Sequence, residues 1–319
     1  MDNLTHSLVG AVMGQAGLKK KTGLAMPALI IGANLPDVDA ACFFWLEGAE
    51  HLGFRRGITH GPPALILLPL ILAGLLWAFD RWQAKRGKRP EKRLPVHFGW
   101  LYALSFIGCL SHPLFDWLNV YGIRFFEPFS SAWFHGDTLF IIDLWLWAIL
   151  GLTLWWSLRK EKKGGENWTK PAWIGIAVGV AYIGANWLIT WFDYNAGGKY
   201  SEPYPAEYIS SPAPFFFWQR ERIARLESGR WISDAWGGTA REYGYSNSEA
   251  VQCALPDLEE ERKTNSELDA FLFWTRAPMA EGERDGSVVL YDARFYDPRA
   301  RDRFSVALPH IRCDEIPAD

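Results

Sequence analysis

The chain has 319 residues, 49% of them hydrophobic, and a formal net charge of −3, which suits one large domain or two ordinary ones. Residues 1–192 carry 18 Lys and Arg against 13 Asp and Glu, whereas residues 193–319 carry 15 against 23. Because the basic residues lie in short loops and the second part is acidic, nucleic acid is excluded as an expected partner. The sequence predicts a mainly α fold class: a polytopic helical membrane domain over residues 1–192, then a small soluble domain, α+β or β-rich, over residues 193–319.

Long apolar runs define the predicted membrane domain. About 20 apolar residues are needed to cross a bilayer. Leu4–Leu18 is short and suits a half-span or an interfacial helix, and Leu24–Leu46 is a span interrupted by polar residues. Broken spans are tolerated where they line a polar cavity. Four uninterrupted spans follow: Pro62–Phe79, His97–Phe115, Leu139–Leu158 and Pro171–Phe192.

Basic residues indicate how these spans are oriented. Three loops, at Lys19–Lys21, Arg81–Arg93 and Arg159–Lys170, hold 15 of the 18 cations of the first part. Alternating spans place these loops on one side, which the positive-inside rule assigns to the cytoplasm. We therefore expect the second domain to be extracytoplasmic, where Cys253 and Cys313 could pair.

The second domain reads as a mixture of short elements. A helix is predicted over Phe215–Ser228, with its aromatic start near the membrane. Strands are predicted at Ala270–Arg276, Ser287–Phe295 and Arg303–Leu308, of which the Val288–Tyr291 run is the clearest.

Histidines and aspartates stand at the ends of the apolar runs of the first part. Burying such groups unpaired is costly, and a bound metal ion would explain several of them together. His112 and Asp116 are four residues apart and share one face of a helix. Two carboxylates as close as Asp37 and Asp39 repel unless a cation lies between them. The candidate ligands are His6, Asp37, Asp39, His60, His112 and Asp116.

Each of these motifs also has an ordinary structural interpretation. A lone histidine on an apolar helix is often a hydrogen-bonded core residue, and an aspartate after a proline is often a turn or a helix cap. Asp137 and Asp143 lie at the mouth of a later span. For Asp143 a metal ligand, a cap and a hydrogen-bonding partner of a ligating histidine are all open, and we favour the partner role for both. Arg55, Arg56 and Arg124 are either loop charges or binders of a substrate anion.

The order of these motifs resembles the YdjM-like family, whose members are inner-membrane-associated, predicted metal-dependent hydrolases, some of them LexA-regulated. The resemblance covers residues 1–192 and rests on T-H near the start, L-P-D-V-D, R-G-I-T-H and H-P-L-F-D-W-L-N-V-Y-G. It implies a bacterial inner-membrane location and metal ligation by the six residues named above. The run G-D-T-L-F-I-I-D, with Asp137 and Asp143, matches a further polar pattern of the family. Where the family often reads H-R-G-x-T-H-S, this chain has Arg55 and Gly61 in place of the first histidine and the serine, so no ligand is available at position 55.

The preferred hypothesis is a membrane-bound metal-dependent hydrolase. Mixed nitrogen and oxygen ligands suit one or two ions of Zn²⁺, Mn²⁺ or Fe²⁺, with zinc preferred. The ion would activate water, whose proton would pass to Asp39 or Asp116. Arg56 would hold an anionic group of a lipid or lipid-linked ester or phosphoester. The alternatives are a transporter or metal-handling protein that uses the same cluster as a transit site, and a non-catalytic scaffold.

Overall fold

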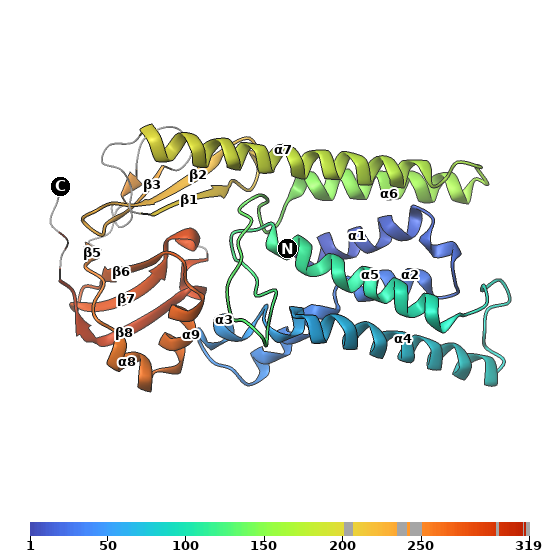
Figure 1. The fold of residues 1–319 in the computed structure, drawn as a ribbon, viewed down its shortest axis with the longest axis horizontal. Coiled ribbons are helices and arrows are strands. Elements are labelled where there is room, and N and C mark those ends of the chain that lie inside the picture. The colour runs from blue at the N-terminus through green and yellow to red at the C-terminus, as the bar shows by residue number, and fades with distance from the viewer. Residues whose placement is uncertain (201–206, 235–240, 243–250, 298–299, 315, 317–319) are drawn as a thin grey trace. The chain divides into compact units, whose positions relative to one another are not determined.

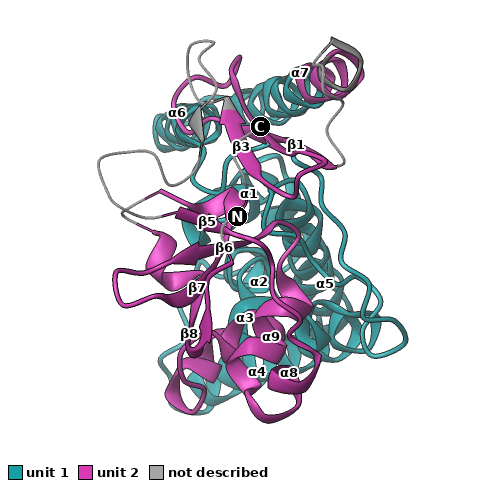
Figure 2. Ribbon diagram, turned by 90° about the vertical axis from the view of Figure 1, so that its left-hand side faces the viewer, with its two compact units in different colours: residues 1–39, 56–187 teal, residues 40–55, 188–319 magenta. Residues whose placement is uncertain are grey.

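The computed structural model describes residues 1–200, 207–234, 241–242, 251–297, 300–314 and 316. The chain divides into two compact units (Figure 2). Unit 1 is residues 1–39 and 56–187, and unit 2 is residues 40–55 and 188–319.

Unit 1 is helical, as Figure 1 shows. The 3₁₀ helix η2 and the long helix α7 each continue from this unit into the next. The helices are α1 (Asn3–Gln15), η1 (Leu18–Lys20), α2 (Ala25–Gly32), η2 (Leu35–Phe44), η3 (Ile58–His60), α4 (Pro62–Lys85), α5 (Phe98–Trp117), α6 (Leu144–Lys162) and α7 (Lys170–Tyr200).

Among the residues that the structure describes, three helices are long and apolar enough to cross a membrane: α4, α5 and residues 170–196 of α7. A fourth span is formed if α2 and η2 are counted together, since they meet at a bend of 51°. This bent pair agrees with the interrupted span predicted at Leu24–Leu46. The prediction of a helical membrane region is therefore confirmed in its main elements.

Helix α6 differs from the span predicted at Leu139–Leu158. It begins only at Leu144, because the carboxylate of Asp143 caps it and accepts a hydrogen bond of 2.8 Å from the Leu146 amide. With this later start, an apolar window of 18 residues must include three charged residues near the end of the helix. Helix α6 is consequently not among the candidate spans that the described residues provide.

Helices α1, α2 and α5 approach one another at glycines. A Cβ atom on Gly10 of α1 would lie 2.7 Å from the carbonyl oxygen of Leu29 in α2, and one on Gly108 of α5 would lie 2.6 Å from the same oxygen. On Gly32 a Cβ atom would lie 2.7 Å from the carbonyl oxygen of Ser105. Small residues at such points let helix backbones come into direct contact, as is common in membranes. The backbones of these three helices are thus held at a fixed close spacing.

Unit 2 contains two four-stranded antiparallel sheets, in each of which neighbouring strands follow one another along the chain. The first is β1 (Glu207–Pro212), β2 (Arg220–Arg225), β3 (Trp231–Asp234) and β4 (Arg241–Glu242). The second is β5 (Val251–Cys253), β6 (Pro278–Gly282), β7 (Ser287–Asp292) and β8 (Ser305–Arg312). The accompanying helices are α3 (Glu50–Phe54), α8 (Glu259–Thr264), α9 (Ser266–Trp274), η4 (Ala293–Phe295) and η5 (Arg301–Arg303).

One apolar core joins the two sheets. Ile209, Ile223 and Trp231 of the first sheet are buried together with Met279 and Tyr291 of the second. Helix α3, in the 40–55 segment, packs on α9, and the amide of Ala49 donates to the carboxylate of Glu267 at 3.4 Å. The segment that follows η2 therefore belongs to unit 2 rather than to a span.

The strand predictions for β7 and β8 are confirmed, and so is the pairing of Cys253 with Cys313, which form a disulfide. The helix predicted over Phe215–Ser228 is wrong, because that stretch is a loop followed by β2. The strand predicted over Ala270–Arg276 is also wrong.

Residues 270–274 instead complete helix α9. Asn265 caps this helix by accepting from the Leu268 amide at 3.1 Å. Its buried residues, Leu268, Phe271 and Trp274, recur every three positions, which is a helical spacing.

Candidate metal centre

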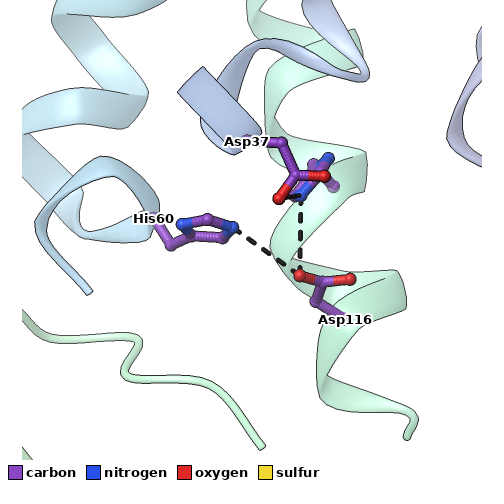
Figure 3. A group of neighbouring side chains, drawn as sticks. Asp37, His60 and Asp116 are labelled. Atoms are coloured by element: carbon purple, nitrogen blue, oxygen red, sulfur yellow. Dashed lines mark ion pairs between the residues drawn. The ribbon is translucent and has the colours of Figure 1, made fainter. Parts of the chain in front are cut away.

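Four side chains of unit 1 converge within the membrane-associated helices. Asp37 comes from η2, His60 from η3, and His112 and Asp116 from α5, and one ligand atom from each lies within 4.8 Å of the others (Figure 3). We call these four residues the metal-site group. His112 Nε2 is 3.7 Å from Asp37 Oδ1 and 3.5 Å from Asp116 Oδ2, and His60 Nε2 is 3.6 Å from Asp116 Oδ2. In a tetrahedral site with bonds of about 2.1 Å, neighbouring ligand atoms are about 3.4 Å apart, so the spacing suits one ion.

Helix α5 supplies two members of the group from one face. His112 and Asp116 are one turn apart, and neither is accessible to solvent. His112 Nδ1 lies 2.7 Å from the carbonyl oxygen of Ala33, the C-cap residue that follows α2. Because only a protonated Nδ1 can donate to a carbonyl, the lone pair of His112 is on Nε2, the nitrogen that faces the group.

His60 is held by a comparable chain of hydrogen bonds. Its Nδ1 is 2.9 Å from Thr59 Oγ1, and that hydroxyl is 3.1 Å from Asp39 Oδ2. All three groups are satisfied when His60 Nδ1 donates to Thr59 and Thr59 donates to Asp39, which leaves the lone pair on Nε2. Burial, together with the nearby His112, lowers the pKa of His60 against the opposing effect of the carboxylates. This shift favours the neutral imidazole, which is the form that binds metals.

The hydrogen bonding of two buried nitrogens in the metal-site group shows whether a cation would fit. His60 Nε2 and His112 Nε2 have no hydrogen-bond partner in the described part of the chain. A buried polar atom left in this way costs about 1–3 kcal/mol. Both lone pairs face the carboxylate of Asp116, so a cation between them would satisfy the three groups together. Two imidazoles and two carboxylates are a donor set that suits Zn²⁺, Mn²⁺ or Fe²⁺.

Asp39 lies behind His60, outside the metal-site group. Its Oδ2 accepts a hydrogen bond of 2.8 Å from the backbone amide of Arg56 as well as the bond from Thr59. It is 4% exposed, and the same oxygen is 3.6 Å from His60 Nδ1. The sequence hypothesis gave Asp39 the roles of ligand and proton acceptor; in the structure its carboxylate bonds to the Arg56 amide and, through Thr59, to His60.

His6 lies on the other side of Asp116. It is fully buried in α1, and its ring stacks on His112 with the centroids 3.8 Å apart. Its Nε2 is 3.3 Å from Asp116 Oδ1, an oxygen that the amino group of Met1 also contacts. The structure therefore brings His6 to the centre, next to the metal-site group rather than within it.

Arg56 is bound inside the protein. Its Nε lies 3.0 Å from Asp116 Oδ2, and Nη1 donates to Asn119 Oδ1 at 3.0 Å and to the Gly122 carbonyl at 3.1 Å. The guanidinium also lies over the ring of Tyr121, 4.4 Å from its centroid. The backbone of Arg56 is left-handed, with φ of 54°, so one residue directs its amide to Asp39 and its side chain to Asp116. A substrate anion would have to share this guanidinium.

Asp143 and Arg124 have contacts away from the metal-site group. Asp143 caps α6 and accepts from the Tyr182 hydroxyl at 2.9 Å. Asp137 is 3% exposed and has a φ of 46°. Arg124 donates from Nη1 to Glu127 at 2.8 Å.

Sequence reasoning missed the supporting residues of the centre. Thr59 was visible only as the residue before His60, and Asn119 only as part of the run after Asp116. The Ala33 carbonyl has no signal in the sequence, because any residue would supply it. A T-H dipeptide is the one pattern that could have indicated a histidine held by its neighbour.

The comparisons with known proteins agree with this description. The model of the family described as YdjM inner membrane protein matches residues 1–192. The chain is also 28% identical over 141 residues to the Bacillus subtilis (strain 168) protein named "Uncharacterized protein YfhP". That alignment covers 42% of this chain and 39% of the relative, so the chain spans about two fifths of the relative's length. No solved structure matches. Because the family model covers more than half of the chain and includes every residue of the centre, this protein belongs to the YdjM inner membrane protein family.

Proposed function

We propose that this protein is a membrane-bound metal-dependent hydrolase with one divalent cation held by Asp37, His60, His112 and Asp116. The observation that carries the proposal is the pair of buried Nε2 atoms of His60 and His112, which lack hydrogen-bond partners among the described residues and face carboxylates. Each imidazole is fixed through its other nitrogen, by Thr59 and by the Ala33 carbonyl. Such support on both rings is typical of metal ligands.

A divalent cation at this position would supply Lewis-acid chemistry, lowering the pKa of a bound water to about 7 and stabilising a developing oxyanion. The side chain of Asp37 is 12% exposed, whereas the other three members are 0–1% exposed. Water and substrate would therefore enter past Asp37. Asp116 would accept the proton of the attacking water. Arg56 and Asp39 would hold Asp116 and His60 in position.

The substrate that we propose is a lipid or a lipid-linked ester or phosphoester. The metal-site group is built partly from a helix that is long and apolar enough to span the bilayer, so a water-soluble substrate would reach it less readily than a lipid. If the substrate is anionic, Arg56 would contact it while keeping its bonds to Asp116 and Asn119.

We further infer that unit 2 is extracytoplasmic. The disulfide between Cys253 and Cys313 is of a kind that persists in oxidising compartments. The basic loop Arg159–Lys170 precedes α7 and favours the cytoplasmic side for the start of that helix. This orientation requires α6 to cross the membrane between α5 and α7, although α6 is not among the candidate spans of the described residues. Reporter fusions at Gly87 and after Asp319 are expected to report opposite sides of the membrane. Fusions that report the same side would overturn this orientation.

The metal is tested by measuring the metal content of the protein purified in detergent. We expect about one equivalent per chain, and a more than 100-fold weaker affinity after His60→Ala or His112→Ala, since each removes one ligand (about 10–100-fold is the usual effect of losing only a supporting residue). His97→Ala is the matched control, because His97 is an exposed histidine that precedes α5. Full metal content in both ligand variants would overturn the metal site.

Hydrolysis is then measured as release of phosphate or fatty acid from a panel of lipids by the metal-loaded protein. The competing function is transit of the metal across the membrane, which the bend of 51° between α2 and η2 favours, since broken helices line transport sites. Metal uptake into vesicles without release of either product would favour transit.

A further inference from the structure

The loop between β1 and β2 carries a run of aromatic residues on the surface of unit 2. Phe215 is 57% exposed, Phe216 is 39% exposed and Trp218 is 51% exposed. The rings touch one another: Trp218 lies with its centroid 5.5 Å from that of Phe216 and 5.1 Å from that of Phe217. We call residues 213–219 the aromatic loop. So much adjacent apolar surface on a domain indicates a contact with a lipid or a protein.

Three hydrogen bonds join the strands of this hairpin to the part of α7 that belongs to unit 2. Arg220 Nε donates to Thr190 Oγ1 at 3.0 Å, and Arg222 Nε donates to Asp193 Oδ1 at 2.7 Å. The hydroxyl of Tyr208 donates to Asp193 Oδ2 at 2.8 Å. Both acceptor residues are buried, at 4% and 8% exposed. The hairpin is therefore fixed against α7 at defined positions along that helix.

These bonds set the position of the aromatic loop along α7. From Arg220 to Arg222, β2 advances in the same direction as α7 from Thr190 to Asp193. Two strand residues advance about 6.6 Å and three helical residues about 4.5 Å, so β2 and α7 advance in the same sense over this stretch. The aromatic loop precedes Arg220 and must lie level with Thr190 or nearer the start of α7. That level is inside the candidate span, which continues to residue 196.

Helix α7 is itself aromatic on its outer side at this level. Trp191 is 47% exposed and Phe192 is 61% exposed, and their ring centroids are 4.9 Å apart. Leu188 is 46% exposed. Tryptophan is enriched where spans meet the headgroup region, because its ring has both apolar and polar parts. The helix and the aromatic loop thus present the same type of side chain at the same level.

The backbone of the aromatic loop is bonded from within the protein. Arg220 Nη1 donates to the carbonyls of Phe217 at 2.7 Å and Gln219 at 3.0 Å. The Gln219 amide donates to the Phe216 carbonyl at 2.7 Å and closes the turn of the loop. Backbone groups that leave water must find partners inside the protein, and here the carbonyls at positions 216, 217 and 219 have them. The loop can therefore enter an apolar layer without exposing these carbonyls to it.

We propose that the aromatic loop is a membrane anchor: residues 215–218 insert into the headgroup region of the bilayer that α7 crosses, and the partner of this surface is lipid. The arguments are the covalent continuity with a candidate span, the depth that Thr190 and Asp193 impose, and the internally bonded backbone of the loop. Aromatic side chains buried at this boundary bind lipid through apolar area and need no specific headgroup. The anchor keeps unit 2 on the membrane surface and does not depend on the metal centre.

The test uses a nitroxide label on the full-length protein in vesicles of phosphatidylethanolamine and phosphatidylglycerol. The label is attached through Phe216→Cys or Trp218→Cys, with Lys263→Cys of α8 as the exposed control in the same unit. The native cysteines do not compete, because Cys42 and Cys109 are buried and the other two are in the disulfide. Relaxation of the label by oxygen, which concentrates in lipid, is compared with relaxation by a water-soluble nickel chelate.

We expect oxygen to relax the labels at 216 and 218 more strongly than the nickel chelate does, and the reverse at 263. Labels at 216 and 218 that behave like the label at 263 would show a loop in water and overturn the proposal. Labels shielded from both reagents would show a protein contact, from a partner or a second copy, and would also overturn it. The chain without an introduced cysteine, treated with the same reagent, gives the background.

Discussion

The buried charged side chains of the metal-site group in unit 1 and of the Asp292–Arg294 pair in unit 2 differ in how they are bonded. In unit 2 the carboxylate of Asp292 receives Arg294 Nε at 2.8 Å, Arg294 Nη2 at 2.7 Å and Thr275 Oγ1 at 2.6 Å, and both charged side chains are 0% exposed. In unit 1, His60 Nε2 and His112 Nε2 face carboxylates without a hydrogen bond from any described residue. Burial of charge alone therefore does not mark a functional site. A completed network stabilises the fold, whereas an incomplete one calls for an explanation, of which a bound ion is one.

The largest expected effect is on the completed network. Asp292→Asn leaves the Arg294 guanidinium buried without its counter-charge, and breaking a buried pair on one side costs about 3–5 kcal/mol. Hydrogen exchange of the β6 and β7 amides measures this loss as a lower free energy of unfolding of unit 2. The control is Asp302→Asn, since the side chain of Asp302 is 83% exposed. Loss of bound metal in Asp292→Asn without loss of protection would contradict the structural role.

Removal of the disulfide of unit 2 is expected to have the next largest effect. Replacing Cys253 and Cys313 with serine removes a link across 60 residues, which is expected to cost about 2–4 kcal/mol, because the unlinked chain gains freedom when unfolded. The same exchange measurement on β5 and β8 detects it. Metal content should stay unchanged. A fall in metal content would mean that metal binding by unit 1 depends on the disulfide of unit 2.

The third effect concerns the incomplete network. Asp39→Asn keeps an acceptor for the Arg56 amide but removes the charge behind Thr59 and His60. We expect the affinity for metal to fall about 10–100-fold, with little change in stability. Asp80→Asn is the matched control, since Asp80 is a buried acid of unit 1 that pairs with Arg89 and Arg93. Equal losses of metal in both variants would contradict a specific role for Asp39.

The smallest effect is the pH dependence of unit 2. Burial raises the pKa of Glu281, although the Tyr296 hydroxyl and Arg301 oppose the shift. The folded state therefore keeps this proton to a higher pH than the unfolded chain, whose pKa is about 4.3. The resulting stability is fully present below that value and is lost as the pH rises through the raised one. Glu281→Gln should weaken this decline in amide protection, and an identical decline in the variant would exclude Glu281 as its source.

The family, the broken span and the residues of the centre could be predicted from the sequence, because their motifs follow apolar runs. The different positions of Asp37 and Asp39 could not. In an α-helix or a 3₁₀ helix, residues two apart point in different directions, at about 240° around the axis in the 3₁₀ case. Asp37 thus faces His112, while Asp39 faces the Arg56 amide. The spacing D-x-D alone does not say which carboxylate faces the ion.

Arg56 shows a second limit of the sequence. An arginine next to a candidate metal ligand suggests a role in binding a substrate anion. The residue type alone does not say whether the guanidinium binds a substrate or groups of the protein itself. Only the left-handed backbone at this position and the nearby Asn119 reveal that the guanidinium is held internally. Neither feature has a pattern in the sequence around position 56.

The shared contact of Gly10 and Gly108 with the Leu29 carbonyl gives a way to disrupt the geometry of the centre. These glycines set the distance between α1, α2 and α5, which carry or support His6, Asp37 and His112. A methyl group at either position would meet the carbonyl at 2.6–2.7 Å and force the helices apart. Metal–ligand bonds tolerate only about 0.2 Å of change. The centre can therefore be lost through a substitution that leaves every ligand in place.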